Sequence, residues 1–172
     1  MKKQEQKGIL DAKELAAYIS DSYSKSHDYN EISKIKLQKS LYFLFAMWGG
    51  MIRKSKCNPD YVEENLSSQN EYLFSNTIEA WVYGPVVPDV YRAKELNSNL
   101  ENAQLVLSAN KFLKETIDSI LLDVFSIADF KLVSISHEDN CWKQNFNFSD
   151  ETHNKEIDKE LIINEYAARE SL

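Results

Sequence analysis

The stretch LYFLFAMWGG, residues 41–50, decides the expected fold of this 172-residue chain. Its first eight residues are all apolar, so a helix formed by them is apolar on every side and should be surrounded by other elements. Ser33 is a residue type that caps helices, so we expect this helix to begin at Lys34 and to form the axis of the core. Each glycine of the Gly49-Gly50 pair disfavours a helix by about 1 kcal/mol relative to alanine, which predicts a bend, close packing or a helix end.

Helical spacing of apolar residues predicts further helices around this axis. Asp11 followed by Glu14 resembles an N-terminal cap, so the first helix is expected over 12–25. The clearest amphipathic pattern is 108–125, with Ser108 as its cap. Its apolar stripe comprises Leu113, Ile117, Ile120, Leu121 and Val124. The other helical segments are expected at 88–97, 129–136, 139–145 and 156–169, the last with Ile157, Leu161 and Ile162 facing inward, and a helical turn is expected near 60–66.

A short β-strand is expected at 77–83, where TIEAWVY combines β-branched and aromatic residues in rough alternation. The strand stops at Gly84-Pro85, which predicts a turn, and the best partner for it is the preceding stretch 71–74. The sequence therefore predicts a mainly α fold: a compact single-domain helical bundle with a central buried helix and a short β-strand or hairpin near 71–83.

The composition fits one globular domain. Hydrophobic residues make up 43% and aromatic residues 12% of the chain, which is enough to bury a real core. We expect residues 1–10 to be a flexible N-terminus and 11–170 to be the domain. No apolar run approaches the roughly 18–20 residues that cross a bilayer, and the Lys-rich start lacks the apolar stretch of a signal peptide. We therefore expect a cytoplasmic protein without a membrane partner.

The net charge of −7 is unevenly distributed. Residues 1–60 hold 11 Lys and Arg against 7 Asp and Glu, a balance of +4, whereas the remainder holds 9 against 20, a balance of −11. Ordinary solvated surface is the simpler interpretation, and a face complementary to a partner is the alternative. Because phosphate contacts need clustered cations, the acidic later part of the chain argues against nucleic acid as a partner.

Candidate metal ligands are few. His137 and Cys141 are four residues apart, a spacing that would place both on one helix face, and Cys57 and His153 could complete a set of four. The chain has no C-x-x-C pair, so we expect no metal site. Two cysteines are also too few for a disulfide framework.

The other catalytic patterns are equally sparse. Glu138 and Asp139 supply the wrong sign of charge for a reactive Cys141 thiolate. Neighbouring acids are usually solvated, and the chain has such pairs at 63–64, 138–139 and 150–151. Four glycines cannot form a phosphate-binding loop. We therefore expect no catalytic residue, no cofactor and no enzymatic activity.

Three lysines, Lys34, Lys36 and Lys39, precede the aromatic block. This pattern also occurs in nucleic-acid grooves with stacking side chains. The simpler interpretation is that the aromatic residues belong to the core and that the lysines snorkel past them to solvent.

Three sequence strings carry a resemblance to a known family: IKLQKSLYF at 35–43, EAWVYGPVVPDVY at 79–91 and SHEDNCWK at 136–143. Their order and spacing resemble the Panacea antitoxin domain, also described as SocA-like and, in phage-associated proteins, as GepA-like. That family carries a Lys-Leu-Gln-Lys-Leu helix, an Ala-Trp-x-x-Gly-Pro-Val strand and turn ending in a Tyr, and a late Pro-Trp-Lys element. The resemblance covers nearly the whole chain. Ser40 replaces the second Leu of the family's Lys-Leu-Gln-Lys-Leu pattern, and Asn140-Cys141 stands where Pro usually precedes the Trp.

The residues that match the family motif are Lys36, Leu37, Gln38, Lys39, Leu41, Tyr42, Glu79, Ala80, Trp81, Tyr83, Gly84, Pro85, Val86, Pro88, Tyr91 and Trp142. We expect them to build the scaffold. Trp81 and Tyr83 alternate with Val82, so one strand face can bury both rings, and Tyr91 is expected to point back to the core. The motif does not identify the toxin-binding residues, which we expect on exposed faces.

The resemblance implies an antitoxin of a toxin–antitoxin system that neutralises a cognate protein toxin, encoded beside it, by direct protein–protein binding. The SocA member acts instead as a proteolytic adaptor that delivers its toxin to the ClpXP protease, which is the first alternative. Many relatives carry an additional DNA-binding domain, and about ten residues before the first expected helix leave no room for one. A nucleic-acid-binding regulator or a counter-defence protein of a phage or mobile element is the alternative from another class, motivated by the basic first third.

Overall fold

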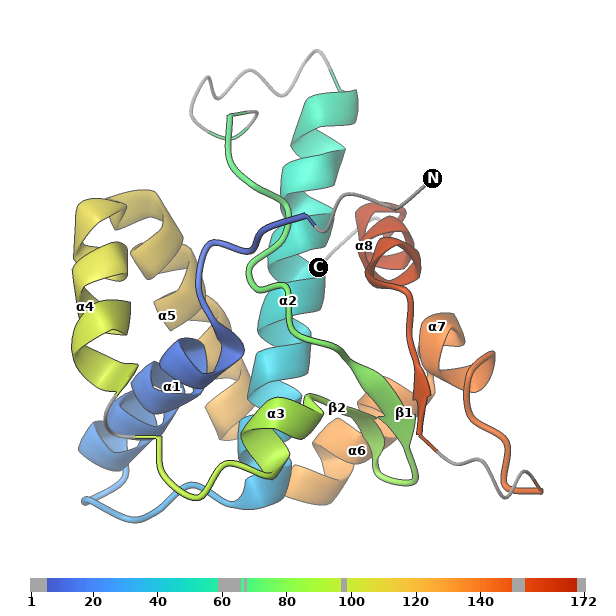
Figure 1. Ribbon diagram of the computed structural model, residues 1–172, viewed down its shortest axis with the longest axis horizontal. Helices are drawn as coiled ribbons and strands as arrows, with labels where there is room; N and C mark the ends of the chain where they lie inside the picture. The colour runs from blue at the N-terminus through green and yellow to red at the C-terminus, as the bar shows by residue number, and fades with distance from the viewer. Residues whose placement is uncertain (1–5, 59–65, 67, 97–98, 150–153, 170–172) are drawn as a thin grey trace.

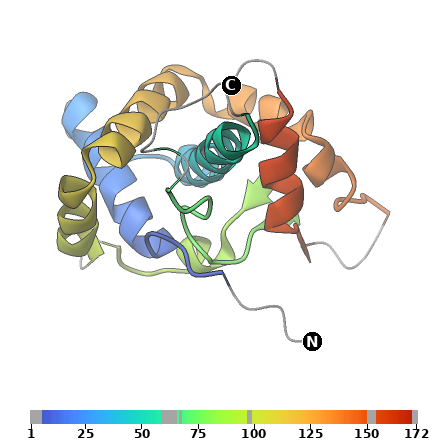
Figure 2. The same ribbon diagram turned by 90° about the horizontal axis from the view of Figure 1, so that it is seen from above.

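The helix α2, Lys34–Cys57, runs through the centre of the molecule and is surrounded by the other elements (Figures 1 and 2). The computed structural model describes residues 6–58, 66, 68–96, 99–149 and 154–169. Ser33 caps α2 by accepting a hydrogen bond from the Lys36 N–H, and every residue of 41–48 is buried except Met47, which is partly buried. The expected axis of the core is confirmed.

The other helices lie around α2. They are α1 (Ala12–Ser26), α3 (Pro88–Tyr91), α4 (Leu100–Ala109), α5 (Lys111–Ser126), α6 (Asp129–His137), α7 (Asn140–Lys143) and α8 (Lys159–Ala167). Figure 2, which views α2 nearly along its axis, shows α1, α4 and α5 on one side of it and α7 and α8 on the other. None of the helices in the described part of the chain has the length and apolar character needed to cross a bilayer.

Two of the expected helix starts are confirmed. Asp11 and Glu14 form a capping box at the start of α1, and Pro88 is the first residue of α3. The expected extension of this helix to 97 is wrong, because α3 ends at Tyr91. The helical turn expected near 60–66 lies outside the described residues apart from Leu66.

The helix expected over 108–125 is two helices that meet at Asn110. The Asn110 side chain caps α5 by accepting from the Leu113 N–H. The Ser108 hydroxyl instead donates to the Gln104 carbonyl within α4, so Ser108 as the cap was wrong. A serine can serve either arrangement, and the local sequence does not decide between them. The apolar stripe of α5 is buried as expected.

The small sheet has the order β2-β1-β3 and is antiparallel, with β1 at Glu79–Trp81, β2 at Gly84–Val86 and β3 at Lys155–Glu156. Trp81 pairs with Gly84. The strand expected at 77–83 is therefore shorter, and the partner expected at 71–74 was wrong. Val82 and Tyr83 make the turn, and Gly84 has a φ of +88°, a backbone conformation that glycine adopts without strain. Gly84-Pro85 thus begins a second strand where a turn was expected.

The stretch 71–74 has another partner. The Ile9 and Leu10 N–H groups donate to the Tyr72 and Leu73 carbonyls, each at 3.0 Å. The flexible segment expected at 1–10 therefore does not include these two residues, and residues 1–5 lie outside the described part of the chain.

The helix α8 starts three residues later than the expected 156, after β3, and the Asp158 side chain caps it. Ile157 and Ile162 are buried as expected, but Leu161 is exposed. The inward stripe of α8 consists instead of Ile162, Ile163 and Tyr166.

The glycine pair of α2 lies under α8 and permits close packing, one of the three outcomes expected for it. A Cβ on Gly49 would lie 2.7 Å from Ile163 Cγ1, and one on Gly50 would lie 2.7 Å from Tyr166 Cβ and 2.8 Å from the Tyr166 carbonyl carbon. Since α2 continues to Cys57, the glycines neither end the helix nor leave space unfilled.

Gly50→Ala is expected to destabilise the protein by about 1–2 kcal/mol, because overpacking against the Tyr166 backbone costs up to about 3 kcal/mol and the gain in helix propensity offsets only about 1 kcal/mol of it. Urea unfolding at constant pH measures the change. Ser134→Ala, on an exposed part of α6, is the control and should change the free energy of unfolding by less than about 0.5 kcal/mol. A Gly50→Ala protein as stable as its parent would contradict this packing.

Candidate functional site

The first two sequence strings meet at a pocket of about 220 Å³. Lys34, Gln38 and Lys39 line it from the start of α2, and Trp81, Tyr83 and Tyr91 line it from the β1–β2 hairpin and α3. Figure 1 shows these segments together at the lower end of α2. Residues about 40 to 60 positions apart in the chain thus form one site.

The wall from α2 is fixed by hydrogen bonds to the hairpin strand and the residue that follows it. The Gln38 Oε1 accepts from the Val87 N–H at 2.8 Å. The Lys39 Nζ donates to the Pro85 carbonyl at 2.8 Å, and this side chain is only 1% exposed. Lys36 is also buried and reaches the Ile127 carbonyl and Asp129. The expectation that Lys36 and Lys39 snorkel to solvent was therefore wrong: each finds a main-chain carbonyl inside the fold.

Burial lowers the pKa of the Lys39 ammonium to about 7, since the surroundings supply little solvation for its charge. Among the ion pairs of the described residues, none includes Lys39. Burial also lowers the pKa of the neighbouring His137, and the Lys39 charge lowers it further. A Cβ at position 84 would lie 2.9 Å from the Lys39 Nζ, so Gly84 allows the hairpin to approach the amine.

The outer wall of the pocket is aromatic and continues onto the surface. The Trp81 and Tyr91 rings meet with centroids 4.8 Å apart, and the Lys34 Nζ lies 5.2 Å from the Tyr91 centroid. Three large apolar side chains that line the pocket are exposed: Val82 (50%), Tyr83 (55%) and Tyr91 (43%). Phe130 (66%) adjoins them, with its ring centroid 6.3 Å from that of Tyr83. We call these four residues the apolar patch.

The apolar patch corrects the expectation for two motif residues. Tyr83 was expected on a buried strand face and Tyr91 in the core, but both are exposed. Tyr83 lies in the hairpin turn, beyond the end of β1, so strand alternation does not place it. Trp81 is half-buried, and its Nε1 donates to Glu79 at 2.8 Å.

Other motif residues build the scaffold as expected. Leu41, Tyr42, Ala80, Pro88 and Trp142 are buried, and so are Val86, Gly84 and Pro85 of β2, while Leu37 packs against the core with partial burial. Trp142 Nε1 donates to the Trp81 carbonyl at 2.9 Å, which ties α7 to the hairpin. The third string therefore supports the site without entering the pocket.

A buried carboxylate, Asp139, joins α2, α7 and α8. It accepts hydrogen bonds from the Tyr42 hydroxyl, from the Tyr166 hydroxyl at 2.8 Å and from Arg169 Nη2 at 2.7 Å. Burial raises the pKa of both tyrosines, so both hydroxyls stay protonated as donors. The interpretation of the pair 138–139 as solvated is wrong for Asp139. The pairs at 63–64 and 150–151 lie outside the described residues.

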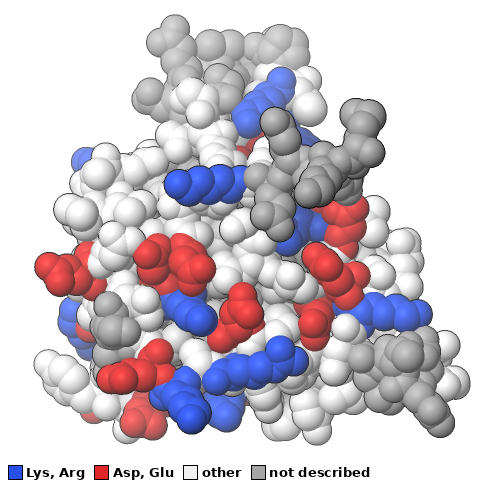
Figure 3. Space-filling view, in the orientation of Figure 1, with Lys and Arg blue, Asp and Glu red and all other residues white. Residues whose placement is uncertain are grey.

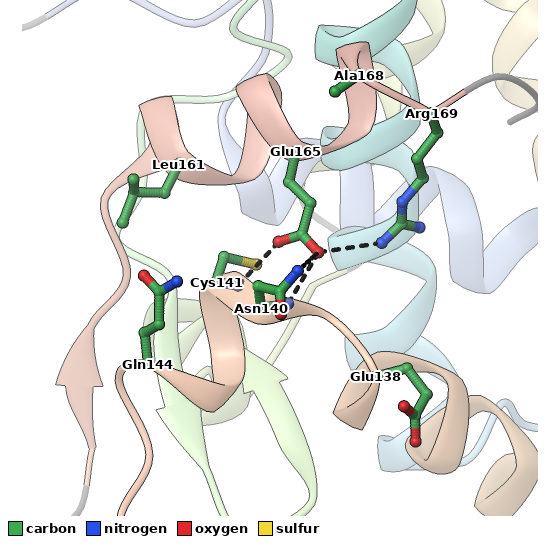
Figure 4. A pocket seen from close by; sticks show the side chains of 8 residues that line it. All are labelled: Glu138, Asn140, Cys141, Gln144, Leu161, Glu165, Ala168 and Arg169. Atoms are coloured by element: carbon green, nitrogen blue, oxygen red, sulfur yellow. Dashed lines mark hydrogen bonds and ion pairs between the residues drawn. The ribbon is translucent and has the colours of Figure 1, made fainter.

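A larger, open hollow of about 610 Å³ lies between α7 and α8 (Figure 4). Its polar groups bind one another: Glu165 accepts from the Asn140 and Cys141 N–H groups, each at 2.8 Å, and from Arg169 at 3.4 Å. Burial raises the pKa of the Cys141 thiol to about 12, so a thiolate is disfavoured there. This hollow is therefore a weaker candidate site.

The candidate zinc ligands do not come together. His137 ends α6 and Cys141 lies in α7, so the expectation of one shared helix face was wrong. Cys57 is exposed, and His153 lies outside the described residues. Within the described part of the chain, no three His, Cys, Asp or Glu side chains form a metal-binding group.

Comparisons with known proteins found no match for the chain among family models, curated proteins or solved structures.

Proposed function

We propose that this protein is an antitoxin that neutralises a cognate protein toxin by direct binding, and that the apolar patch is its contact surface. The observation that carries the proposal is the grouping of Val82, Tyr83, Tyr91 and Phe130 in solvent beside a pocket. Grouped, exposed large apolar side chains mark interaction sites, and aromatic residues dominate the energetics of protein interfaces. The toxin as partner comes from the resemblance to the Panacea domain.

The elements that carry the patch favour tight binding. Phe130 lies in α6 and Tyr91 in α3, and the hairpin is held by Gln38, Lys39 and Trp142. A surface held in one conformation loses little entropy on binding.

The charge distribution supports a protein over a nucleic acid. Figure 3 shows acidic side chains among the Lys and Arg side chains of the face that it presents, without a field of one sign. Nucleic-acid surfaces need clustered cations to replace counterions along the phosphate backbone.

Co-expression with the protein encoded beside it tests the proposal. We expect rescue of growth from the toxin and co-purification of a complex. The double variant Tyr83→Ser, Phe130→Ser should weaken the complex by at least about 30-fold, since each removed aromatic anchor costs at least about 1 kcal/mol. Leu105→Ser, an equally exposed apolar position on α4, is the matched control and should bind like the parent.

Absence of both rescue and complex would refute the proposal. A toxin half-life that shortens only when ClpXP is active would identify the adaptor role instead. Binding to duplex DNA that falls steeply between low and moderate salt would identify the nucleic-acid-binding alternative.

A further inference from the structure

The Lys39 ammonium is a buried cation that forms no ion pair with any residue that the structure describes. It carries three N–H donors, and among the described residues its hydrogen bond is the one to the Pro85 carbonyl. Tyr42 and Asp139, by contrast, satisfy each other inside the same core. Burying a charge without a counter-charge is unfavourable, so an anionic group that reaches Lys39 would relieve an existing cost. The first requirement on a ligand is therefore a negative charge.

The pocket volume sets the second requirement. An apolar cavity of roughly 150 Å³ holds one benzene molecule, so about 220 Å³ accommodates a six-membered ring together with a small polar group. An Asp or Glu side chain carries only one or two methylenes and would leave the Trp81 and Tyr91 walls without contact atoms. Sites for drug-sized molecules begin at roughly 300 Å³, so the pocket suits a single apolar residue.

The surroundings of the opening set the third requirement. Val82, Tyr83 and Phe130 are exposed around it, and a small free acid in the pocket would leave them in water. A protein whose chain end enters the pocket covers them as well. Lys34 adds a second positive charge at the opening, next to the Tyr91 ring.

A C-terminal residue meets all three requirements, because it carries an apolar side chain and a carboxylate on one Cα. We propose that this pocket binds the C-terminal residue of a partner protein, with its apolar side chain against Trp81 and Tyr91 and its carboxylate on the Lys39 ammonium. The inference rests on the proposed function in one respect: the partner is a protein that covers the apolar patch.

Titration of the full chain with short peptides at pH 6, where the Lys39 amine is protonated, tests the inference without a toxin; amide NMR shifts report binding. The probe is acetyl-Gly-Gly-Phe with a free C-terminal carboxylate. The matched probes are its C-terminal amide, which lacks the charge, acetyl-Gly-Gly-Ala with a free carboxylate, which lacks the ring, and acetyl-Gly-Glu-Gly-amide, whose carboxylate is on a side chain. A fifth probe, 3-phenylpropionate, represents a free small acid.

We expect the first peptide to bind at least about tenfold more tightly than the amide, the Ala peptide and the Glu peptide, because a charge-assisted hydrogen bond and a buried ring each contribute that much. We expect 3-phenylpropionate to bind more weakly than the first peptide as well, because this small acid has no chain that extends over the apolar patch. The largest shifts should lie at the β1–β2 hairpin and at the start of α2. Lys39→Met should weaken binding of this peptide at least about tenfold, whereas Lys111→Met, a change at an exposed lysine of α5, should not alter it.

Equal affinity for the acid and the amide, or equal affinity of Lys39→Met and the parent, would overturn the inference. Tighter binding of 3-phenylpropionate than of the peptide would overturn it in favour of a small-molecule site, and tighter binding of the Glu peptide would overturn it in favour of an acidic side chain.

The two proposals fail separately. If the peptide binds as expected but no complex forms with the adjacently encoded protein, the proposed function fails and the pocket assignment stands. If the complex forms and depends on Tyr83 and Phe130 but the peptide does not bind, the pocket assignment alone fails.

Discussion

Lys39→Met is expected to stabilise the protein by about 2–4 kcal/mol at pH 6. Each step of one in pKa corresponds to about 1.36 kcal/mol, so the fall from 10.5 to about 7 corresponds to about 5 kcal/mol of unfavourable burial of the charged amine. Methionine has a similar length and removes this charge. It also leaves the Pro85 carbonyl without its donor, which costs about 1–3 kcal/mol. The difference between the two terms is the expected gain.

The effect has a defined pH dependence. Between about pH 7 and pH 10.5 the unfolded chain binds a proton at Lys39 that the folded protein does not, so the free energy of unfolding of the parent rises with pH in this window. Below pH 7 the amine is protonated in both states, and the unfavourable burial is fully present. His137 is the titratable group that interacts electrostatically with Lys39, and its lowered pKa places its own titration below this window. The advantage of Lys39→Met should therefore be largest at pH 6 and reverse toward pH 10, where the charge no longer opposes folding and the unpaired Pro85 carbonyl remains as a cost.

Urea unfolding at pH 6, 8 and 10 measures these changes, with Lys111→Met as the control. The control should follow the parent at each pH, since Lys111 is exposed. A Lys39→Met protein that is less stable than the parent at pH 6 would contradict the prediction. Lys39 would then lower the stability of the fold while strengthening the binding of the proposed C-terminal carboxylate. Functional residues commonly combine these two effects.

Asp139→Ala is expected to destabilise the protein by about 3–5 kcal/mol, which is a large part of the roughly 5–15 kcal/mol that stabilises a typical domain. The change removes the acceptor of Tyr42, Tyr166 and Arg169 together. The two tyrosine side chains are buried and have no route to water, so their hydroxyls would lose their partner inside the core. Thermal or urea unfolding measures the loss.

Glu138→Ala is the matched control, because it removes the neighbouring carboxylate on the same segment. The Glu138 side chain is exposed and pairs with Lys143 at 3.1 Å, an interaction worth at most about 1 kcal/mol. Similar changes in the free energy of unfolding for the two substitutions would show that Asp139 does not hold α2, α7 and α8 together. The sequence alone treats these adjacent acids as equivalent.

The features that the sequence predicted correctly are local. An apolar pattern on all sides of 41–48 places α2 in the centre whatever its neighbours are, and the caps at Asp11 and Ser33 act on N–H groups within three residues. The predicted strand pairing was wrong because it depends on features outside the strand itself. The choice of partner for β1 depends on the positive φ at Gly84 and on β3, which lies more than 70 residues later.

The site was predicted only in part. The motif residues Gln38, Lys39, Trp81, Tyr83 and Tyr91 were singled out, but as buried scaffold, and their common pocket was not foreseen. A lysine next to aromatic residues is compatible with both snorkelling and burial, and the Pro85 carbonyl, 46 residues away, decides between them. Asp139 was missed because its tyrosine partners lie 97 and 27 residues away, so no local pattern marks it.

The packing of α8 on the glycine pair also has a consequence for folding during protein synthesis. Translation produces α2 early and residues 159–167 more than a hundred codons later. Until α8 has left the ribosome, Gly49 and Gly50 lack the Ile163 and Tyr166 side chains that pack on them, and Asp139 lacks Tyr166. The apolar surface of α2 that is exposed at this stage can bind chaperones and promote association between nascent chains. The final packing of this fold is therefore expected to form only once α8 has emerged, as one late step.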